Sequence, residues 1–190
     1  MIKNSRILIV DDVIDNIRVA MNILKEDNYD FSFAHNGAEA IRLITEESEP
    51  FDLILLDIMM PGVDGFEVSK KLKENPKTRD IPIIFLTAKV DVDSITEGFN
   101  LGAVDYITKP FHANELLVRV KTHLELYHAK ELLKKHNIDL KTKAKFEQHR
   151  LLSELEGSQK EMIFILTELM EATSDETGKH IRRIAELSAI

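Results

Sequence analysis

Residues 6–12 read RILIVDD, an apolar and β-branched run that stops abruptly at two acids. Similar apolar runs recur at residues 51–57, which read FDLILLD and end at Asp57, and at residues 81–87, which read IPIIFLT and end at Thr87. Unbroken apolar runs of this length are typical of strands buried on both faces of a parallel sheet. We therefore predict strands at residues 6–10, 51–56 and 81–86, with weaker candidates at 31–34 and 104–107.

Helical patterns fill the gaps between these runs. Apolar side chains recur there at three- and four-residue spacing, and breakers such as Asn36-Gly37 and Pro61-Gly62 separate the segments. The predicted apolar faces are Ile17, Ala20, Met21 and Leu24; Ala40, Ile41 and Ile44; Val68 and Leu72; and Ile95 and Phe99. The alternation predicts an α/β fold, a doubly wound five-stranded parallel sheet with helices on both faces and right-handed crossovers.

Composition restricts the class of protein. The 190 residues are 44% apolar and 31% charged, which suits one full domain with a smaller extension. A net charge of -8 disfavours nucleic acid as a partner, and the lack of cysteine excludes disulfides and thiolate metal sites. Since no apolar run approaches the roughly 18 residues of a membrane span, we expect a soluble, cytoplasmic protein without a membrane partner.

Polar side chains follow the predicted strands at the points where they end. Asp11 and Asp12 follow the first strand, Asp57 and Thr87 follow two others, and Lys109 follows the last. Because ligands bind beyond the carboxyl ends of parallel strands, we expect these five side chains to share one edge. Acids at strand ends also cap helices and turns, but five ordered positions together favour a functional site.

The chemistry of this group points to phosphoryl transfer. Three crowded carboxylates need a cation, and an all-oxygen site suits Mg²⁺. A metal beside Asp57 would neutralise an incoming phosphoryl group and make this carboxylate a usable nucleophile. Lys109 could pair with Asp57 or with the phosphate, and Thr87 offers a hydroxyl group to a phosphate oxygen.

Four stretches together resemble the response-regulator receiver family: ILIVDD at 7–12, DIMMPGVDG at 57–65, FLTA at 85–88 and GAVDYITKPF at 102–111. The resemblance covers roughly residues 3–126. It implies a flavodoxin-like sheet with strand order 2-1-3-4-5. It also implies that Asp57 is phosphorylated by a sensor histidine kinase, a phosphotransfer protein or a small phosphodonor.

The same resemblance implies roles for the neighbouring residues. The Mg²⁺ ligands would be Asp12, Asp57, the backbone carbonyl of Met59 and, through water, Asp11. Thr87 and Lys109 would hold the phosphoryl group, and Tyr106 would swing inward when Thr87 moves. The Lys109-Pro110 peptide is expected to be cis.

The second part of the chain reads as a long helix, because residues 111–156 contain no Gly and no Pro. Apolar residues at heptad-like spacing mark its two ends, Leu117, Val120, Leu124 and Tyr127 at one and Leu152, Leu155, Met162, Leu166 and Leu169 at the other. The seam between them is polar: Glu131, Lys134, Lys141, Lys145 and Gln148. A dimeric coiled coil and an amphipathic helix packed on its own domain both fit this pattern, with Gly157-Ser158 as a candidate joint.

The last segment carries a weaker signal. Glu176 and His180 share a helical face and could ligate a transition metal, whereas Thr173 and Glu176 could instead form a capping box. The segment resembles the first helix of the HD-GYP family of cyclic-di-GMP phosphodiesterases, in which the matching positions are metal ligands. The family's His-Asp pair and Gly-Tyr-Pro stretch are absent before Ile190. We expect a truncated protein with an incomplete metal site, no hydrolysis of cyclic di-GMP, and phosphorylation from phosphodonors as its only reaction.

These observations predict a receiver domain (1–126), a helical or coiled-coil linker (127–172) and the first helix of an HD-GYP-like output domain (173–190). The leading hypothesis is a homodimeric response regulator that controls a phosphodiesterase containing a transition-metal pair. A receiver on a dimerising coiled coil that acts only by binding proteins is the alternative. A DNA-binding regulator is disfavoured by the charge and by the lack of a second helix-turn-helix pattern. A sensor kinase fragment using His149 lacks the expected neighbouring acid and proline.

Overall fold

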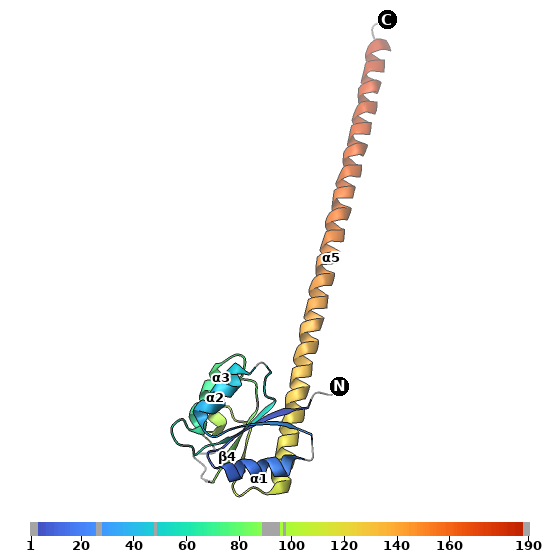
Figure 1. Ribbon diagram of the computed structural model, residues 1–190. Coiled ribbons are helices and arrows are strands. Elements are labelled where there is room, and N and C mark those ends of the chain that lie inside the picture. The colour runs from blue at the N-terminus through green and yellow to red at the C-terminus, as the bar shows by residue number, and fades with distance from the viewer. Residues whose placement is uncertain (1–3, 26–27, 48, 89–95, 97, 188–190) are drawn as a thin grey trace. The chain divides into compact units, whose positions relative to one another are not determined.

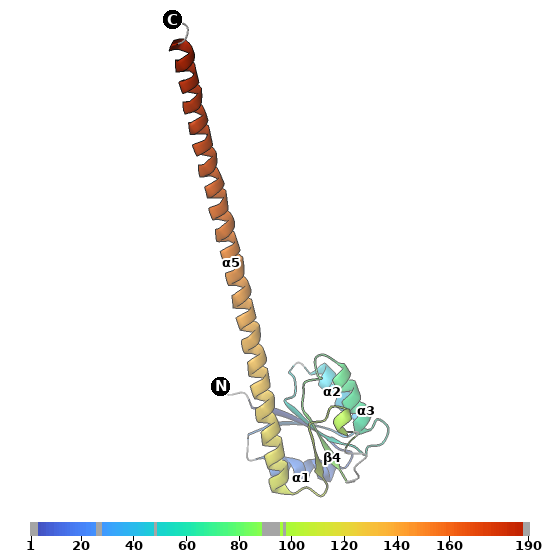
Figure 2. The same ribbon diagram turned by 180° about the vertical axis from the view of Figure 1, so that it is seen from behind.

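A computed structural model describes residues 4–25, 28–47, 49–88, 96 and 98–187 (Figures 1 and 2). Five parallel strands form one sheet in the order β2-β1-β3-β4-β5, which confirms the predicted fold class and strand order. The strands are β1 (Arg6–Val10), β2 (Asp30–Ala34), β3 (Leu53–Asp57), β4 (Ile83–Thr87) and β5 (Asp105–Thr108).

Strands β3 and β4 each begin two residues later than predicted and end one residue later. Phe51 and Ile81 are buried apolar residues, but they precede the ladder and fill the core without pairing in it. At the other end the ladder continues onto the polar side chains, because Asp57 pairs with Leu86 and Thr87 pairs with Thr108. Asp57 and Thr87 are therefore the last residues of their strands, and the ladder fixes their backbone.

The helices cover both faces of the sheet, as predicted (Figure 1). Helices α2 (Gly37–Glu46) and α3 (Gly65–Glu74) pack on one face, where the even-numbered residues of β1 and β3 form a buried cluster. Helix α1 (Ile14–Leu24) and the first turns of α5 (Ala113–Leu187) pack on the opposite face. Of the predicted fourth helix face, Phe99 lies in helical backbone at 98–100, and Ile95 lies outside the described residues.

Helix α5 is continuous from Ala113 to Leu187, and it runs through Gly157-Ser158 without a break. Thr173 lies inside this helix and its Oγ1 donates a hydrogen bond to the Leu169 carbonyl at 2.6 Å. The capping-box alternative for Thr173 and Glu176 is therefore wrong, because a cap requires a helix that begins there. None of the helices in the described residues combines the length and the apolar character that a membrane span needs.

The two apolar ends of α5 differ in their surroundings. Val120 and Leu124 are buried in the cluster beneath the sheet, and Leu117 packs at its margin. For this end the alternative of a helix packed on its own domain is correct. At the other end Leu155 and Met162 are 58% and 62% exposed. The chain divides into two units, residues 1–133 and 134–190, and the coiled coil remains a prediction for the second.

Candidate functional site

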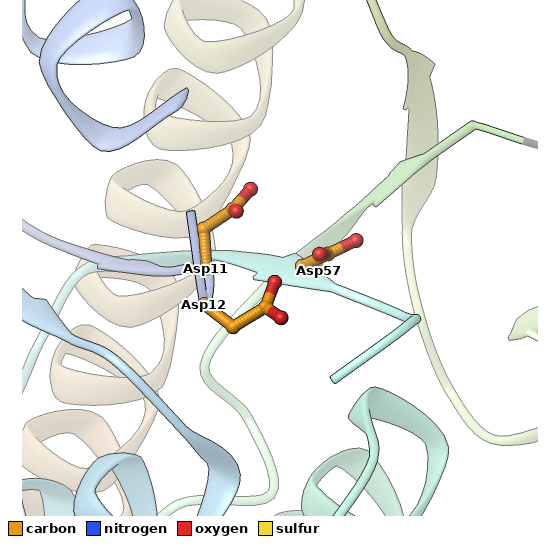
Figure 3. A group of neighbouring side chains, drawn as sticks. All are labelled: Asp11, Asp12 and Asp57. Carbon is orange, nitrogen blue, oxygen red and sulfur yellow. The ribbon is translucent and has the colours of Figure 1, made fainter. Parts of the chain in front are cut away.

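Three carboxylates meet at the carboxyl edge of the sheet, as predicted (Figure 3). Asp11 and Asp12 directly follow β1, and Asp57 is the last residue of the adjacent strand β3. One oxygen of each lies within 4.8 Å of those of the other two. Asp11 and Asp57 are buried and Asp12 is exposed, so the cluster opens to solvent on the Asp12 side.

Lys109 completes the cluster from the loop that follows β5. Its Nζ lies 2.6 Å from Asp11 Oδ2 and 2.9 Å from Asp57 Oδ2, so one ammonium bridges two carboxylates. The sequence predicted the contact with Asp57 and missed the contact with Asp11. The peptide between Lys109 and Pro110 is cis, as the family resemblance implies.

The cluster fits a divalent cation. Three ionised carboxylates and one ammonium leave the group with two negative charges, which one divalent ion would balance. Asp11 Oδ2 is buried, and among the described residues its ion-pair partner is Lys109, at 2.6 Å. Lys109 is shared with Asp57, so it does not balance the charge of the buried Asp11 carboxylate alone, and hard oxygen ligands are those that Mg²⁺ prefers. Asp11, Asp12 and Asp57 could therefore hold such an ion.

The other oxygen of Asp11 has a structural task. Asp11 Oδ1 accepts hydrogen bonds from the Val13 backbone N–H at 3.0 Å and from Asn16 Nδ2 at 2.9 Å. Val13 is the N-cap of α1 and its side chain makes no capping bond, so Asp11 supplies an acceptor at this helix start. The capping interpretation of Asp11 is thus correct for one oxygen and the cation-site interpretation fits the other.

Sequence reasoning missed Asn16. The available signal was an amide side chain in the first turn of a helix whose N-cap position holds Val13, which cannot cap. The free N–H groups of such a turn must find an acceptor elsewhere, and the carboxylate that follows the preceding strand is the nearest candidate.

The electrostatic surroundings of Asp57 favour its neutral form. Burial raises the pKa of this carboxyl above its ordinary value, and the nearby Asp11 charge adds to the rise. Lys109 and the Met59 backbone N–H, which lies 3.4 Å from Asp57 Oδ1, oppose this shift without cancelling it. An additional positive charge at the site would lower this pKa and favour the ionised, nucleophilic form of Asp57.

The backbone that holds Asp57 is closely packed against the start of α3. The Gly65 N–H donates to the Ile58 carbonyl at 3.0 Å, and a Cβ at position 65 would lie 2.3 Å from the Asp57 carbonyl oxygen. Only glycine permits this approach. A depression of about 400 Å³ adjoins the cluster, lined by Asp12, Ile58, Met59, Met60, Pro61, Asp64 and Phe66.

Thr87 and Tyr106 lie on neighbouring strands. Thr87 ends β4 with a buried side chain, and its carbonyl accepts the Lys109 N–H at 2.8 Å. Tyr106 pairs with Phe85, two residues before Thr87 along the ladder, and is half-buried. Its ring stands edge-on to Phe99 with centroids 6.2 Å apart. The structure thus brings Asp11, Asp12, Asp57 and Lys109 together and places Tyr106 outside that cluster.

Glu176 and His180 lie four residues apart in α5, as predicted. Their side chains fall outside the described residues, so the predicted metal ligation there stays a prediction.

The sequence of the chain is similar to those of known proteins. The family model described as the response regulator receiver domain matches residues 7–121. The protein named "Probable cyclic di-GMP phosphodiesterase" of Vibrio cholerae serotype O1 is 41% identical over 177 residues, which are 93% of this chain and 38% of that protein. The transcriptional regulatory protein ResD of Bacillus subtilis is 44% identical over 120 residues, 63% of this chain and 48% of ResD.

A solved structure agrees with the sequence matches. The response regulator receiver domain protein (CheY-like) from Methanospirillum hungatei JF-1 aligns with a TM-score of 0.61 and 29% identity, over 67% of this chain and 99% of that one. This chain spans less than half the length of the two curated relatives. The two curated matches differ in extent, because ResD matches 63% of the chain and the Vibrio protein 93%.

Proposed function

Because the chain belongs to the response regulator receiver family, we propose that Asp57 accepts a phosphoryl group in a Mg²⁺-dependent reaction and thereby controls an output domain through α5. The observation that carries the proposal is the buried Asp57, at the end of a central strand and within 4.8 Å of two further carboxylates. A sensor histidine kinase, a phosphotransfer protein or a small phosphodonor would supply the group.

The reaction would be a single displacement at phosphorus. An Asp57 carboxylate oxygen forms a bond to phosphorus, and the bond from phosphorus to the donor breaks, with its electron pair leaving on the donor. Asp12, Asp57, the Met59 carbonyl and, through water, Asp11 would hold Mg²⁺, which would supply neutralisation of the charge on the transferring group. Lys109 Nζ, now shared between Asp11 and Asp57, would turn to the new phosphoryl oxygens.

The response to phosphorylation would begin at Thr87. Its hydroxyl group lies at the same edge of the sheet as Asp57, on the neighbouring strand, and would donate to a phosphoryl oxygen. Tyr106 would then move inward. Its ring is now only half-buried and stands edge-on to Phe99. Such a movement would shift the population between two conformations of the domain surface around Tyr106.

The proposed output is a cyclic-di-GMP phosphodiesterase of the HD-GYP type. Support comes from the match to the Vibrio protein, which extends past the receiver along most of α5, whereas the ResD match does not. In a complete output domain Glu176 and His180 would belong to a transition-metal pair. The uninterrupted α5 supports a mechanical linkage, with the exposed seam at 152–169 as the surface of a homodimer. A receiver on a coiled coil that acts only by binding proteins remains the second candidate.

Incorporation of phosphate from labelled acetyl phosphate tests the central claim. With Mg²⁺ present, the wild-type chain should gain a hydroxylamine-sensitive acyl phosphate, and Asp57→Asn should gain none while keeping its fold. Asp64→Asn is the matched control, because Asp64 lies at the same edge but caps α3, a task that asparagine also performs. Label on the Asp57→Asn protein would show that the site is assigned wrongly.

A further inference from the structure

Asp11 is a carboxylate with its two oxygens assigned to different tasks. Oδ1 accepts from the Val13 N–H and from Asn16 Nδ2, and Oδ2 faces Lys109 and the other carboxylates. The side chain is fully buried, so neither oxygen can turn to bulk water for a replacement partner. The orientation of the carboxylate plane is therefore set by the hydrogen bonds to Oδ1 together with the Lys109 contact at Oδ2.

The final torsion of an aspartate side chain is broad and roughly two-fold, so a single donor does not fix the plane of its carboxylate. The Val13 N–H is one donor, supplied by the backbone at 3.0 Å. Asn16 supplies the second from the first turn of α1, and its own backbone N–H donates to the Val13 carbonyl at 3.0 Å. Two donors from different parts of the turn hold the carboxylate in one orientation.

We propose that Asn16 is a positioning residue for the cation site: it keeps Asp11 Oδ1 engaged so that Oδ2 is presented to the ion. The proposal rests on the Mg²⁺ site of the proposed function. Asn16 acts through Asp11 and does not contact the ion itself. It is neutral, so it orients the carboxylate without adding a charge to a cluster that Lys109 only partly neutralises.

The size of the effect follows from what outer hydrogen-bond partners do at metal sites. Loss of a residue that orients a ligand typically weakens metal affinity about 10- to 100-fold. Asp11 is expected to act through water, so the lower part of this range applies, and we expect about a 10-fold loss of affinity. The rate of phosphorylation should recover at saturating Mg²⁺, because Asp57 and Lys109 are unchanged.

A helix-starting role alone would give a different result. If Asn16 served only to stabilise the first turn of α1, its removal would lower the unfolding temperature without metal and leave the ion's dissociation constant unchanged. The two roles are therefore separated by measuring binding of the metal directly rather than activity.

The test uses the full chain and Mn²⁺ as the probe, with free Mn²⁺ measured by electron paramagnetic resonance. Asn16→Leu and Asn16→Ala remove the donor with and without preserving side-chain volume. Asn22→Leu is the matched control, since Asn22 is an exposed residue on the same helix. Both Asn16 variants should bind Mn²⁺ about 10-fold more weakly than wild type, and Asn22→Leu should bind it equally.

Two contrary outcomes have different meanings. Wild-type affinity in a folded Asn16 variant overturns the positioning role and leaves the proposed function intact. A wild-type chain that binds no Mn²⁺ overturns the cation site itself, and with it both proposals. The Mg²⁺ dependence of acetyl phosphate uptake gives a second readout, in which the Asn16 variants should need about 10-fold more Mg²⁺ for half-maximal rate.

Discussion

Gly65→Ala is the substitution whose effect the structure constrains most closely. Residue 65 opens α3 directly against the strand that ends in Asp57, the proposed phosphate acceptor. The added Cβ would lie 2.3 Å from the Asp57 carbonyl oxygen and 2.8 Å from the Ile58 Cα. Both atoms belong to the backbone, so no side-chain rotation can relieve the contact.

Two opposing effects set the magnitude. Alanine is favoured over glycine in a helix interior by about 1 kcal/mol, an upper limit for the first helical position, and this alone predicts a more stable protein. Non-bonded heavy atoms prefer separations near 3.5 Å, so the new contact is too close by about 1 Å. Overpacking of this kind typically costs about 1–3 kcal/mol, and the upper part applies because only backbone can yield. We expect a net loss of about 2 kcal/mol in the free energy of unfolding.

Urea unfolding followed by tyrosine fluorescence measures this loss. The three tyrosines, Tyr29, Tyr106 and Tyr127, all lie in the unit formed by residues 1–133, so the signal reports that unit. The variant should also accept phosphate more slowly, because relief of the contact displaces Asp57. A variant at least as stable as wild type, with an unchanged phosphorylation rate, would refute the reasoning.

Gly157→Ala is the matched control for that experiment. A Cβ at this position in α5 meets nothing within 4 Å. Only the helix preference then acts, and we expect about 1 kcal/mol of local helix stabilisation. It should appear as slower amide exchange around residue 157, with no change in the tyrosine-detected transition.

Two further predictions concern the half-buried amine of Lys73 and the exposed seam at 152–169. Burial lowers the pKa of Lys73 to about 8 from 10.5, so between these values the unfolded state binds more protons. Stability of the wild-type chain should therefore rise with pH from about 8 to 10.5 relative to Lys73→Met, and parallel curves in urea titrations across this window would contradict the assignment. Replacing Leu155 and Leu166 with lysine should convert a concentration-dependent dimer to monomer in sedimentation equilibrium, since it charges the exposed apolar seam. Identical masses for both proteins over the same concentration range would exclude that seam as the dimer surface.

The sheet and the carboxylate cluster could be predicted because their signals are local. A buried parallel strand needs a continuous apolar run, and an acid that ends such a run must lie at the carboxyl edge. The Asp11 contact with Lys109 could not be predicted in the same way, since residues 98 positions apart are brought together only by the order of the strands. Asn16 was missed because asparagine in a first helical turn is common and its partner depends on how Asp11 turns.

The apolar residues at the start of α5 show what helical periodicity alone cannot predict. Leu117, Val120 and Leu124 have the spacing of a coiled coil, yet they pack against the sheet of their own domain. The same three- and four-residue spacing suits either surface, so the pattern locates a helix and its apolar face but does not identify what covers that face. Leu155 and Met162 repeat the pattern where nothing in the described residues covers them.

The length of helix α5 also allows its apolar side chains to change their direction around the helix axis. Leu152 comes 28 residues after Leu124, which is four heptads. In a left-handed supercoil the two leucines would keep the same azimuth, whereas in a straight α-helix the heptad drifts by about 20° per repeat, or about 80° over this distance. Pairing of two copies would therefore rotate Leu152 about the axis of α5 by up to about that angle relative to Leu124. Rotation of this kind needs no hinge, and it would make the azimuth of Leu152 a measure of whether α5 is paired.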